Sequence, residues 1–287
     1  MTLKWVGAAT AVAVGVGAVT LVAARPDGAT AASSTASSSY HVVWHDDFDG
    51  NALSSAKWLL HPTSAAAGRG CATVSPKMTT VKGGVASFAA VVDKSKTKTT
   101  ACPTSYLNSQ VVSPQSFLYG KFEARIKMQS PQGMHAAFWM LPGGSVPSGV
   151  SSSDLPGYRG TEVDVAEFFG DAFTKKGNPK GALYSYVYWP KKSGPAVKTE
   201  GNTAKASKAI GKKKFSAGYH TYAVEWTPSA YIFSVDGKQT AKITVGISHR
   251  PESLLLSILT SDWELPKMKS SSLPASMKVD WVRVSQK

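Results

Sequence analysis

Three carboxylates lie close together in the segment Thr161–Phe169, whose other residues are mostly apolar and β-prone. They are Glu162, Asp164 and Glu167. Acidic side chains are seldom buried without a paired or functional role. Crowded carboxyl groups differ in proton affinity, so one can attack as an anion while another donates a proton, as glycoside hydrolysis requires. Two rival interpretations stay open: a cation site, which also needs oxygen-rich loop geometry, and a chance acidic strip on an edge strand.

The spacing of the acids places a condition on the strand that carries them. In a regular strand Glu162 and Asp164 share one face, and Glu167 points to the other. One β-bulge between Asp164 and Glu167 brings all three to the same side, and bulges are frequent beside active sites. With about 3.3 Å per strand step, the outer carboxyl groups then lie roughly 5–8 Å apart, a range that overlaps both retaining and inverting glycosidases.

The elements around the acids follow a two-residue period. In Tyr119–Gln129, Phe122, Ala124 and Ile126 fall on one face and charged residues on the other, which predicts a half-buried strand. Similar runs predict strands at Val42–Phe48, Val85–Val92, Tyr106–Val112, Thr161–Phe169, Leu183–Trp189, Tyr219–Trp226, Leu254–Thr260 and Met277–Val284. Asp236-Gly237 predicts a hairpin turn between Ala230–Val235 and Lys238–Val245. We expect an all-β fold, a sandwich of two antiparallel sheets, with helices at most minor.

The N-terminal region has the composition of an export signal. Residues 1–32 contain Lys4, an apolar stretch and small residues that allow cleavage near Ala24 or Ala32. An uncleaved anchor is the alternative, because about 20 apolar residues can just span a bilayer. Residues 33–39 form a Ser/Thr/Ala-rich linker, and one folded domain is expected over 40–287. The protein is therefore predicted to be extracellular.

Cys71 and Cys102 are the two cysteines of the chain. An even number of cysteines in an exported chain predicts one disulfide bond, with a pair of buried free thiols as the alternative. No C-x₂-C or H-E-x-x-H spacing occurs, so a zinc site has no support. Serine-nucleophile, dinucleotide and phosphate-loop motifs are absent as well.

The chain is strongly basic, with 32 Lys and Arg against 18 Asp and Glu and a net charge of +14. Such a charge favours anionic surroundings. Lysine outnumbers arginine, whose rigid fork reads bases and phosphates, and no nucleic-acid-binding motif is present, so nucleic acid is not an expected partner. Two long irregular loops are predicted, Pro142–Gly160 and the Lys-rich segment Thr174–Lys214, which holds 11 lysines and one acid. The second is either a solvated surface or an electrostatic rim of the site.

The order of motifs resembles glycoside hydrolase family 16, whose laminarinase-like members carry E-x-D-x-x-E on a bulged strand. Glu162, Asp164 and Glu167 match that signature. The resemblance extends over about residues 42–284, through the segments 44–50, 119–125, 137–139, 219–228, 236–237 and 279–284. It implies a β-jelly-roll with an open cleft and a retaining endo-mechanism on β-linked glucans or galactans. Glu162 would be the nucleophile, Glu167 the general acid/base, and Asp164 the residue that shares a proton with the nucleophile.

The chain departs from the family pattern at two places. His135 stands where laminarinases usually carry a Trp in the cleft, and Tyr184-Ser185-Tyr186 stands where a His is usual. Both changes affect the expected glucan subsites and leave the acids intact. Asp280 resembles a structural calcium ligand of the family, although no calcium loop is legible.

Candidate substrate-binding residues are mainly aromatic, because carbohydrate clefts present ring faces and a few polar groups. They are Trp139, His135, Trp189, Trp263 and Arg125. Arg125 has a plainer alternative, pairing with Glu123, and each Trp has the alternative of core packing. Trp226 and Trp281 are expected in the core.

The leading hypothesis is a secreted, retaining endo-β-glucanase that needs no cofactor and acts as a monomer without stable membrane association after signal cleavage. One alternative is a carbohydrate-binding, lectin-like module with little turnover, motivated by the two departures. Another is a hydrolase of sulfated galactans, motivated by the +13 charge that remains without residues 1–32.

Overall fold

The computed structural model describes residues 39–63, 68–143, 160–189 and 197–287. The predicted signal segment 1–32, almost all of the linker 33–39 and nearly all of the predicted loop Pro142–Gly160 lie outside the described residues. Within the described part of the chain, no helix is long and apolar enough to cross a membrane.

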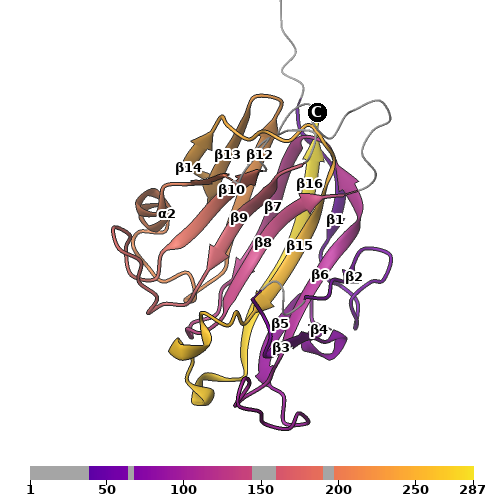
Figure 1. Cartoon of the computed structure of the whole chain (residues 1–287). Helices are drawn as coiled ribbons and strands as arrows, with labels where there is room; N and C mark the ends of the chain where they lie inside the picture. Colours follow the sequence, from indigo (N-terminus) through magenta and orange to yellow (C-terminus); the bar gives the residue numbers. More distant parts are fainter. Residues whose placement is uncertain (1–38, 64–67, 144–159, 190–196) are drawn as a thin grey trace, which may run out of the picture. The chain divides into compact units, whose positions relative to one another are not determined.

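The described chain is built almost entirely from antiparallel strands (Figure 1). We call one layer the acid-bearing sheet; its strands run in the order β11-β10-β9-β8-β15-β6. They are β11 (Val197–Glu200), β10 (Leu183–Trp189), β9 (Glu162–Phe168), β8 (His135–Pro142), β15 (Glu252–Leu259) and β6 (Tyr106–Phe117), with β2 (Leu59–Leu60) and the parallel strand β3 (Ala72–Val74) on β6.

The other layer, the second sheet, continues in the order β5-β16-β7-β12-β13-β14. Its strands are β5 (Val85–Val92), β16 (Ala275–Gln286), β7 (Gly120–Lys127), β12 (His220–Thr227), β13 (Ala230–Val235) and β14 (Lys238–Ile243), with β1 (His41–Asp46) on β16 and β4 (Thr79–Lys82) on β5. A short pairing of β5 with β6 joins the two sheets. The expected two-sheet, jelly-roll-like sandwich is thus confirmed.

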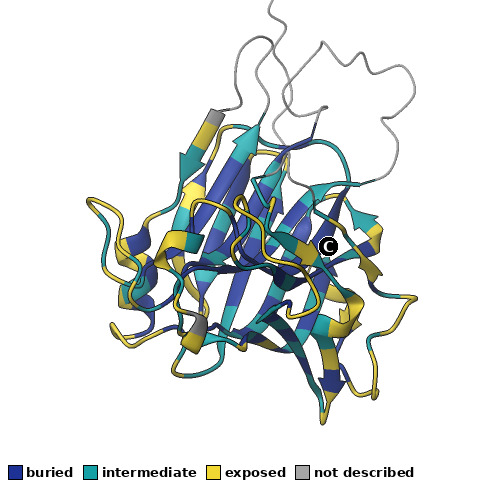
Figure 2. Ribbon diagram, turned by 60° about the horizontal axis from the view of Figure 1, so that its bottom comes forward, coloured by how far each residue is buried: buried dark blue, intermediate teal, exposed yellow. Residues whose placement is uncertain are grey.

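The core lies between the sheets because each strand alternates apolar and polar residues. Phe122, Ala124 and Ile126 of β7 are fully buried, as their spacing predicts. Phe138, Phe168 and Leu256 from the acid-bearing sheet pack in the same cluster as Phe88, Phe122 and Val282 from the second. Figure 2 shows buried residues along the strands and exposed residues in the connections. Burying one side of each sheet leaves the other side of β8, β9 and β10 for a site.

The Lys-rich segment Thr174–Lys214 is more regular than predicted. It contains β11, which adds to the edge of β10, and the short helix α2 (Thr203–Ala209). The Asn202 side chain caps this helix by accepting the backbone N–H of Lys205 at 2.9 Å. Ala206 and Ala209 are buried on its inner side. Two turns are too short for the three-turn apolar period that indicates a helix, so the sequence pattern missed it.

The two tryptophans expected in the core differ from each other. Trp226 is fully buried and packs against Tyr231 and Phe122. Trp281 is only half-buried, with the guanidinium of Arg283 4.4 Å from its ring centroid. The ladder between β16 and β7 is irregular between Val279 and Trp281, which breaks the alternation that predicted an inward ring.

Candidate active site

The three acids lie on β9, and the strand contains the expected bulge. Against β8, Phe138 pairs with Ala166 and Trp139 pairs with Asp164, so Val165 has no partner of its own. The β9–β10 ladder shifts over the same stretch. One extra residue restores Glu167 to the face that Glu162 and Asp164 occupy. The sequence condition for a shared carboxylate site is therefore met.

Residues directly opposite in a ladder share a face, so the register defines the neighbours of the acids. On β10, Tyr188 lies opposite Glu162, Tyr186 opposite Asp164 and Tyr184 opposite Glu167. On β8, the same face carries His135, Ala137 and Trp139. The opposite face carries core residues such as Val163, Ala166 and Phe168. The acids thus lie outside the core, among aromatic side chains.

A cavity of about 390 Å³ opens on this face beside Glu167. Its aromatic walls come from Phe169, Phe173, Tyr186, Tyr188 and Trp263, and its cations are Arg69, Lys175 and Lys198. The Lys198 ammonium lies 3.4 Å from the ring centroid of Tyr186 and 4.9 Å from that of Tyr188. Flat rings bordered by a few polar groups suit a sugar ring, which presents apolar C–H faces and polar edges.

The acids are buried near one another, and this raises their proton affinities. Burial, followed by the charge of Glu167, raises the pKa of Glu162. Burial and the charges of Glu167 and Glu162 raise the pKa of Asp164 well above its usual value. Burial also raises the pKa of Glu167, while the charge of His135 opposes that shift. A site with one anion and protonated neighbours has the division of roles that acid-assisted displacement needs.

His135 and two residues that the sequence analysis did not single out border Glu167. His135 Nδ1 lies 2.7 Å from Glu264 Oε2, and its Nε2 lies 3.9 Å from Glu167 Oε1. Arg69 Nη2 approaches His135 Nε2 at 3.5 Å. Arg69 and Glu264 come from connections far apart in the sequence, with no local pattern that marks them, so only the fold reveals them.

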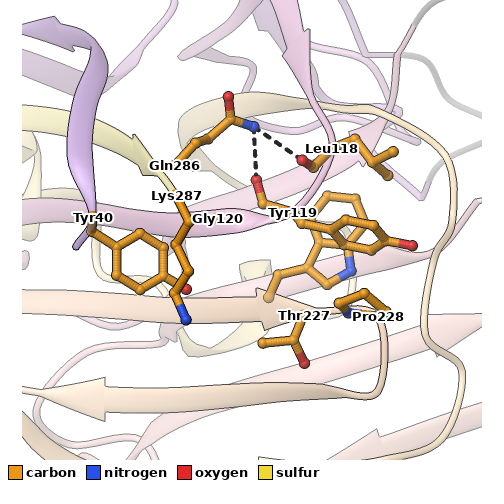
Figure 3. A pocket seen from close by; sticks show the side chains of 9 residues that line it. Tyr40, Leu118, Tyr119, Gly120, Thr227, Pro228, Gln286 and Lys287 are labelled. Atoms are coloured by element: carbon orange, nitrogen blue, oxygen red, sulfur yellow. Dashed lines mark hydrogen bonds between the residues drawn. The ribbon is translucent and has the colours of Figure 1, made fainter. Parts of the chain in front are cut away.

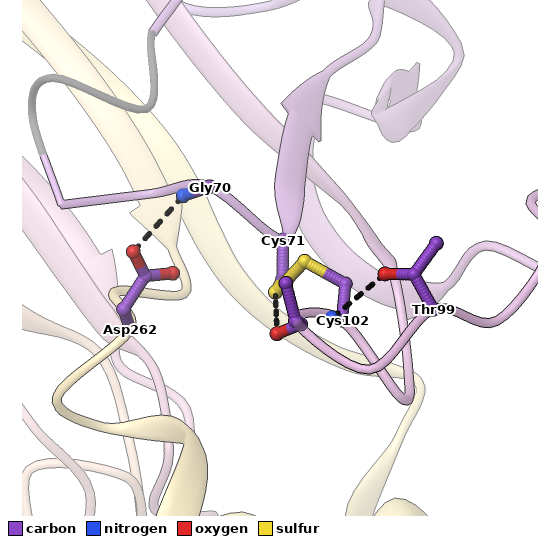
Figure 4. The surroundings of a disulfide bond; sticks show 6 residues. Gly70, Cys71, Thr99, Cys102 and Asp262 are labelled. Carbon is purple, nitrogen blue, oxygen red and sulfur yellow. Dashed lines mark hydrogen bonds between the residues drawn. A yellow bond between two sulfur atoms is a disulfide. The ribbon is translucent and has the colours of Figure 1, made fainter.

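Cys71 and Cys102 form the expected disulfide bond, which lies two residues from Arg69 (Figure 4). In the same segment, the Gly70 N–H donates to Asp262 Oδ2 at 3.0 Å, next to Trp263. The Asp262 N–H donates in turn to the Gly68 carbonyl at 2.8 Å. The disulfide therefore anchors a segment that supplies one cation to the cavity and holds the loop bearing one of its aromatic walls.

The sequence of the chain is similar to those of known proteins. A family model described as beta-porphyranase A-D, GH16 domain, matches residues 43–286. The chain belongs to glycoside hydrolase family 16. This family 16 chain is 26% identical over 276 residues to glucan endo-1,3-beta-glucosidase A1 of Niallia circulans, a match that covers 85% of the chain and 37% of the relative. It is 27% identical over 214 residues to a beta-glucanase of Fibrobacter succinogenes, covering 72% and 54%. It thus spans about half or less of the length of these relatives.

Solved structures support the fold of the family 16 chain. The laminarinase from Rhodothermus marinus superposes with a TM-score of 0.66 at 22% sequence identity, over 86% of this chain and 98% of that one. At this identity the likeness concerns the fold.

Three of the five predicted substrate-binding residues lie at the cleft of the family 16 site. His135 and Trp263 line the cavity, and Trp263 is 54% exposed. Trp139 lies opposite Asp164, and its Nε1 donates to Ser257 Oγ at 3.1 Å. All three therefore stay candidate substrate contacts.

Trp189 and Arg125 lie elsewhere, and the structure corrects both expectations. Trp189 points to the core side of β10, where its ring packs on Gly246. Successive residues of a strand face opposite sides, and the preceding residue, Tyr188, faces the cavity. Arg125 belongs to β7 in the second sheet, where it forms an ion pair with Asp280, and its guanidinium carbon lies 4.9 Å from the Tyr219 ring centroid. The predicted partner Glu123 instead pairs with Lys121.

The ion pair with Arg125 also bears on the calcium expectation at Asp280. A guanidinium bound to the carboxylate competes with a divalent cation for the same oxygens. Among the described residues no group of three His, Cys, Asp or Glu side chains has a metal-binding arrangement. The Asp280 carboxylate thus has Arg125 as its partner in this structure, and the proposed chemistry uses no metal.

A separate hollow of about 390 Å³ lies on the second sheet (Figure 3). It is lined by Tyr40, Tyr119, Pro228, Gln286 and other residues at the end of β16 and the β12–β13 turn. Gln286 Nε2 donates to the carbonyls of Leu118 and Tyr119 at 3.0 Å each. None of the three acids lines it, so the candidate chemistry belongs to the cleft on β9.

Proposed function

We propose that this family 16 domain is a secreted, endo-acting, retaining glycosidase that hydrolyses β-1,3- or mixed-linkage β-glucan. The observation that carries the proposal is the bulge at Val165, which gathers Glu162, Asp164 and Glu167 on the open face of β9. The glucanase names of the relatives support the β-glucan assignment. The aromatic walls of the cavity support a saccharide substrate.

Each acid has a distinct task in the proposed double displacement. Glu162 attacks the anomeric carbon as a carboxylate, while Glu167 gives its proton to the departing glycosidic oxygen. Glu167, now an anion, then takes a proton from water, and the resulting hydroxide equivalent releases the sugar from Glu162. The second step returns to Glu167 the proton that it gave in the first, so the cycle ends with water added across the glycosidic bond and both acids restored.

Asp164 suits a supporting role because it lies between the two reacting acids on the same face. Burial and the charges of Glu167 and Glu162 raise its pKa well above the usual value, which favours its protonated form. A protonated Asp164 can donate a hydrogen bond to the nucleophile and stabilise its anion without adding a second negative charge. The pair then shares one proton, as closely spaced carboxyl groups do.

A sulfated galactan such as porphyran is the second candidate substrate. Three cations, Arg69, Lys175 and Lys198, line the catalytic cavity, and the matching family model is described by its porphyranases. Sulfate esters would pair with these cations, whereas a neutral glucan carries no group of opposite charge for them. Lys175 already donates to Glu200 at 2.6 Å.

Reducing-end release from laminarin, mixed-linkage β-glucan and porphyran tests the proposal. We expect release from one of the two glucans with wild type, loss of release with Glu162→Gln, and little change between low and moderate salt. Release from porphyran alone, weakening above about 0.15 M salt as the screening length falls to roughly 8 Å, would favour the sulfated galactan. Polymer binding without any release, unchanged in Glu162→Gln, would identify a binding module and reject the glycosidase.

Secretion is part of the proposal and rests on the leader-like segment and on the disulfide, which forms in oxidising compartments. Expression with the full leader should yield an extracellular protein whose N-terminus begins after residue 24 or 32. A cell-associated product that keeps residue 1 would support the uncleaved anchor instead.

A further inference from the structure

Glu264, His135 and Glu167 form a row of three titratable side chains that come from three different elements. His135 begins β8, Glu167 lies on β9, and Glu264 precedes the short helical turn at 265–267. Glu264 is 2% exposed and His135 is 5% exposed. A histidine buried between two carboxylates is costly to build unless the charges compensate one another.

The hydrogen bonds fix how the His135 ring is used. Glu264 Oε2 accepts from the Ser261 N–H at 3.1 Å and lies 2.7 Å from His135 Nδ1. A carboxylate acceptor requires a proton on Nδ1. Nε2 is the nitrogen that faces both Glu167 and Arg69. At 3.9 Å from Glu167 Oε1, that contact is a charge interaction rather than a direct hydrogen bond.

Charge compensation favours a cationic His135. Burial and the charge of Arg69 disfavour the imidazolium, but the charge and hydrogen bond of Glu264, with the charge of Glu167, outweigh them and raise the pKa of His135. For Glu167 the effects are opposed: burial and Glu264 raise its pKa, and His135 lowers it. The charged His135 ring therefore offsets the negative charge of Glu264.

Other charged or titratable groups of the described residues also surround the row, and the three variants proposed below leave them unchanged. They are Glu162 and Asp164 on β9, Arg69, Lys175, Lys198, Asp262 and the tyrosines 184, 186 and 188. Of these, Arg69 and Lys198 lower the pKa of Glu167. None of them stands between Glu264 and His135, which are in direct contact.

We propose that Glu264 and His135 are positioning residues for Glu167: Glu264 fixes the ring of His135, and the charged ring balances Glu264 so that Glu167 can both release and accept a proton. This rests on the proposed acid/base role of Glu167. Without the ring, Glu264 and Glu167 become two buried anions with less compensation. Glu167 would then hold its proton to higher pH and act more slowly as the base of the second step.

The pH dependence of kcat/KM tests the proposal through three variants, His135→Gln, Glu264→Gln and the double variant. In His135→Gln the alkaline limb, which reports the protonated acid/base, should move up by about half a pH unit or more, because the neutral amide no longer offsets the charge of Glu264. One pH unit corresponds to about 1.4 kcal/mol. The double variant, which removes both charges, should return most of the way to wild type. An unshifted limb in His135→Gln, or equal shifts in the single and double variants, would overturn the proposal.

His45→Gln is the matched control. His45 Nδ1 also lies 2.7 Å from a carboxylate oxygen, that of Asp47, but its side chain is 56% exposed on β1 in the second sheet. Its loss should leave the limb in place. Thermal unfolding of each variant separates a folding defect from a shift in ionisation.

Carbon-13 NMR titration of the Glu167 carboxyl and the His135 ring measures the ionisation of both groups without turnover. This test therefore holds even if the proposed hydrolysis fails. We expect the pKa of His135 to lie above its usual value in wild type and to fall in Glu264→Gln. We expect the Glu167 carboxyl to titrate higher in His135→Gln. If both groups titrate at unchanged pH in these variants, the row is only structural.

Discussion

The backbone N–H of Gly70 donates to Asp262 Oδ2 at 3.0 Å and thereby ties the disulfide segment to the loop that carries Trp263. One residue on, Cys71 is bonded to Cys102. One residue back, Arg69 reaches His135. The wall of the cleft is thus held by a covalent cross-link in addition to the pairing of β3 with β6.

Removal of the cross-link should therefore affect both stability and substrate binding. The Cys71→Ser/Cys102→Ser variant frees a loop with a sequence separation of 31. In the chain-entropy model the loss of unfolding free energy is about 3–4 kcal/mol. We expect a lower Tm and a higher KM, with kcat less affected, because the acids themselves lie on β9. An unchanged Tm and KM would show that strand contacts alone hold the segment.

Trp263 and Trp189 give opposite predictions because they face different sides of the acid-bearing sheet. Trp263→Ala should raise KM roughly fivefold, equivalent to about 1 kcal/mol of ring contact, and leave Tm unchanged. Trp189→Ala should lower stability by about 2–3 kcal/mol through lost core packing without a selective effect on KM. Steady-state kinetics and thermal unfolding of both variants check this. The reverse pattern would mean that their assignments to cleft and core are exchanged.

Glu252 on β15 predicts a pH dependence of stability. It is fully buried, its Oε1 accepts from the Thr161 N–H at 3.3 Å, and burial raises its pKa from 4.5 to about 8. The folded state thus binds a proton that the unfolded state releases, so stability is full below pH 4.5 and falls as pH rises toward 8. Glu252→Gln keeps an acceptor for Thr161 and should be more stable than wild type at pH 8, by on the order of a few kcal/mol.

Urea unfolding of wild type and Glu252→Gln at pH 4 and pH 8 checks the prediction. The two proteins should have similar stability at the lower pH and diverge at the higher one. A constant difference at both would mean that Glu252 does not change its ionisation on folding.

Much of the fold was predictable because the strands alternate. Leu183–Trp189 and Val85–Val92 have the bounds that the sequence indicates, and the bulge at Val165 follows from the need to place Glu167 beside Glu162. Helix α2 was missed because two turns give too short a period. Trp189 was misplaced because composition does not tell which face of β10 an aromatic residue occupies.

The site was only half predictable for a related reason. Glu162, Asp164 and Glu167 can be recognised from the sequence because they are acids in an apolar strand. Arg69 and Glu264 are single charged residues in connections, and their partnership with His135 depends on a disulfide and a loop contact that join distant segments. No periodicity marks a residue whose role depends on such tertiary contacts.

The most direct test of the central claim compares Glu162→Gln and Glu167→Gln with wild type on a polymer and on an aryl glycoside with a good leaving group. We predict that Glu162→Gln loses roughly three or more orders of magnitude in kcat on both substrates, because the covalent step is removed. Glu167→Gln should lose activity on the polymer and recover much of the first step on the aryl glycoside, where acid assistance matters less. Wild-type rates in Glu162→Gln would contradict the assignment of the β9 acids as the catalytic centre.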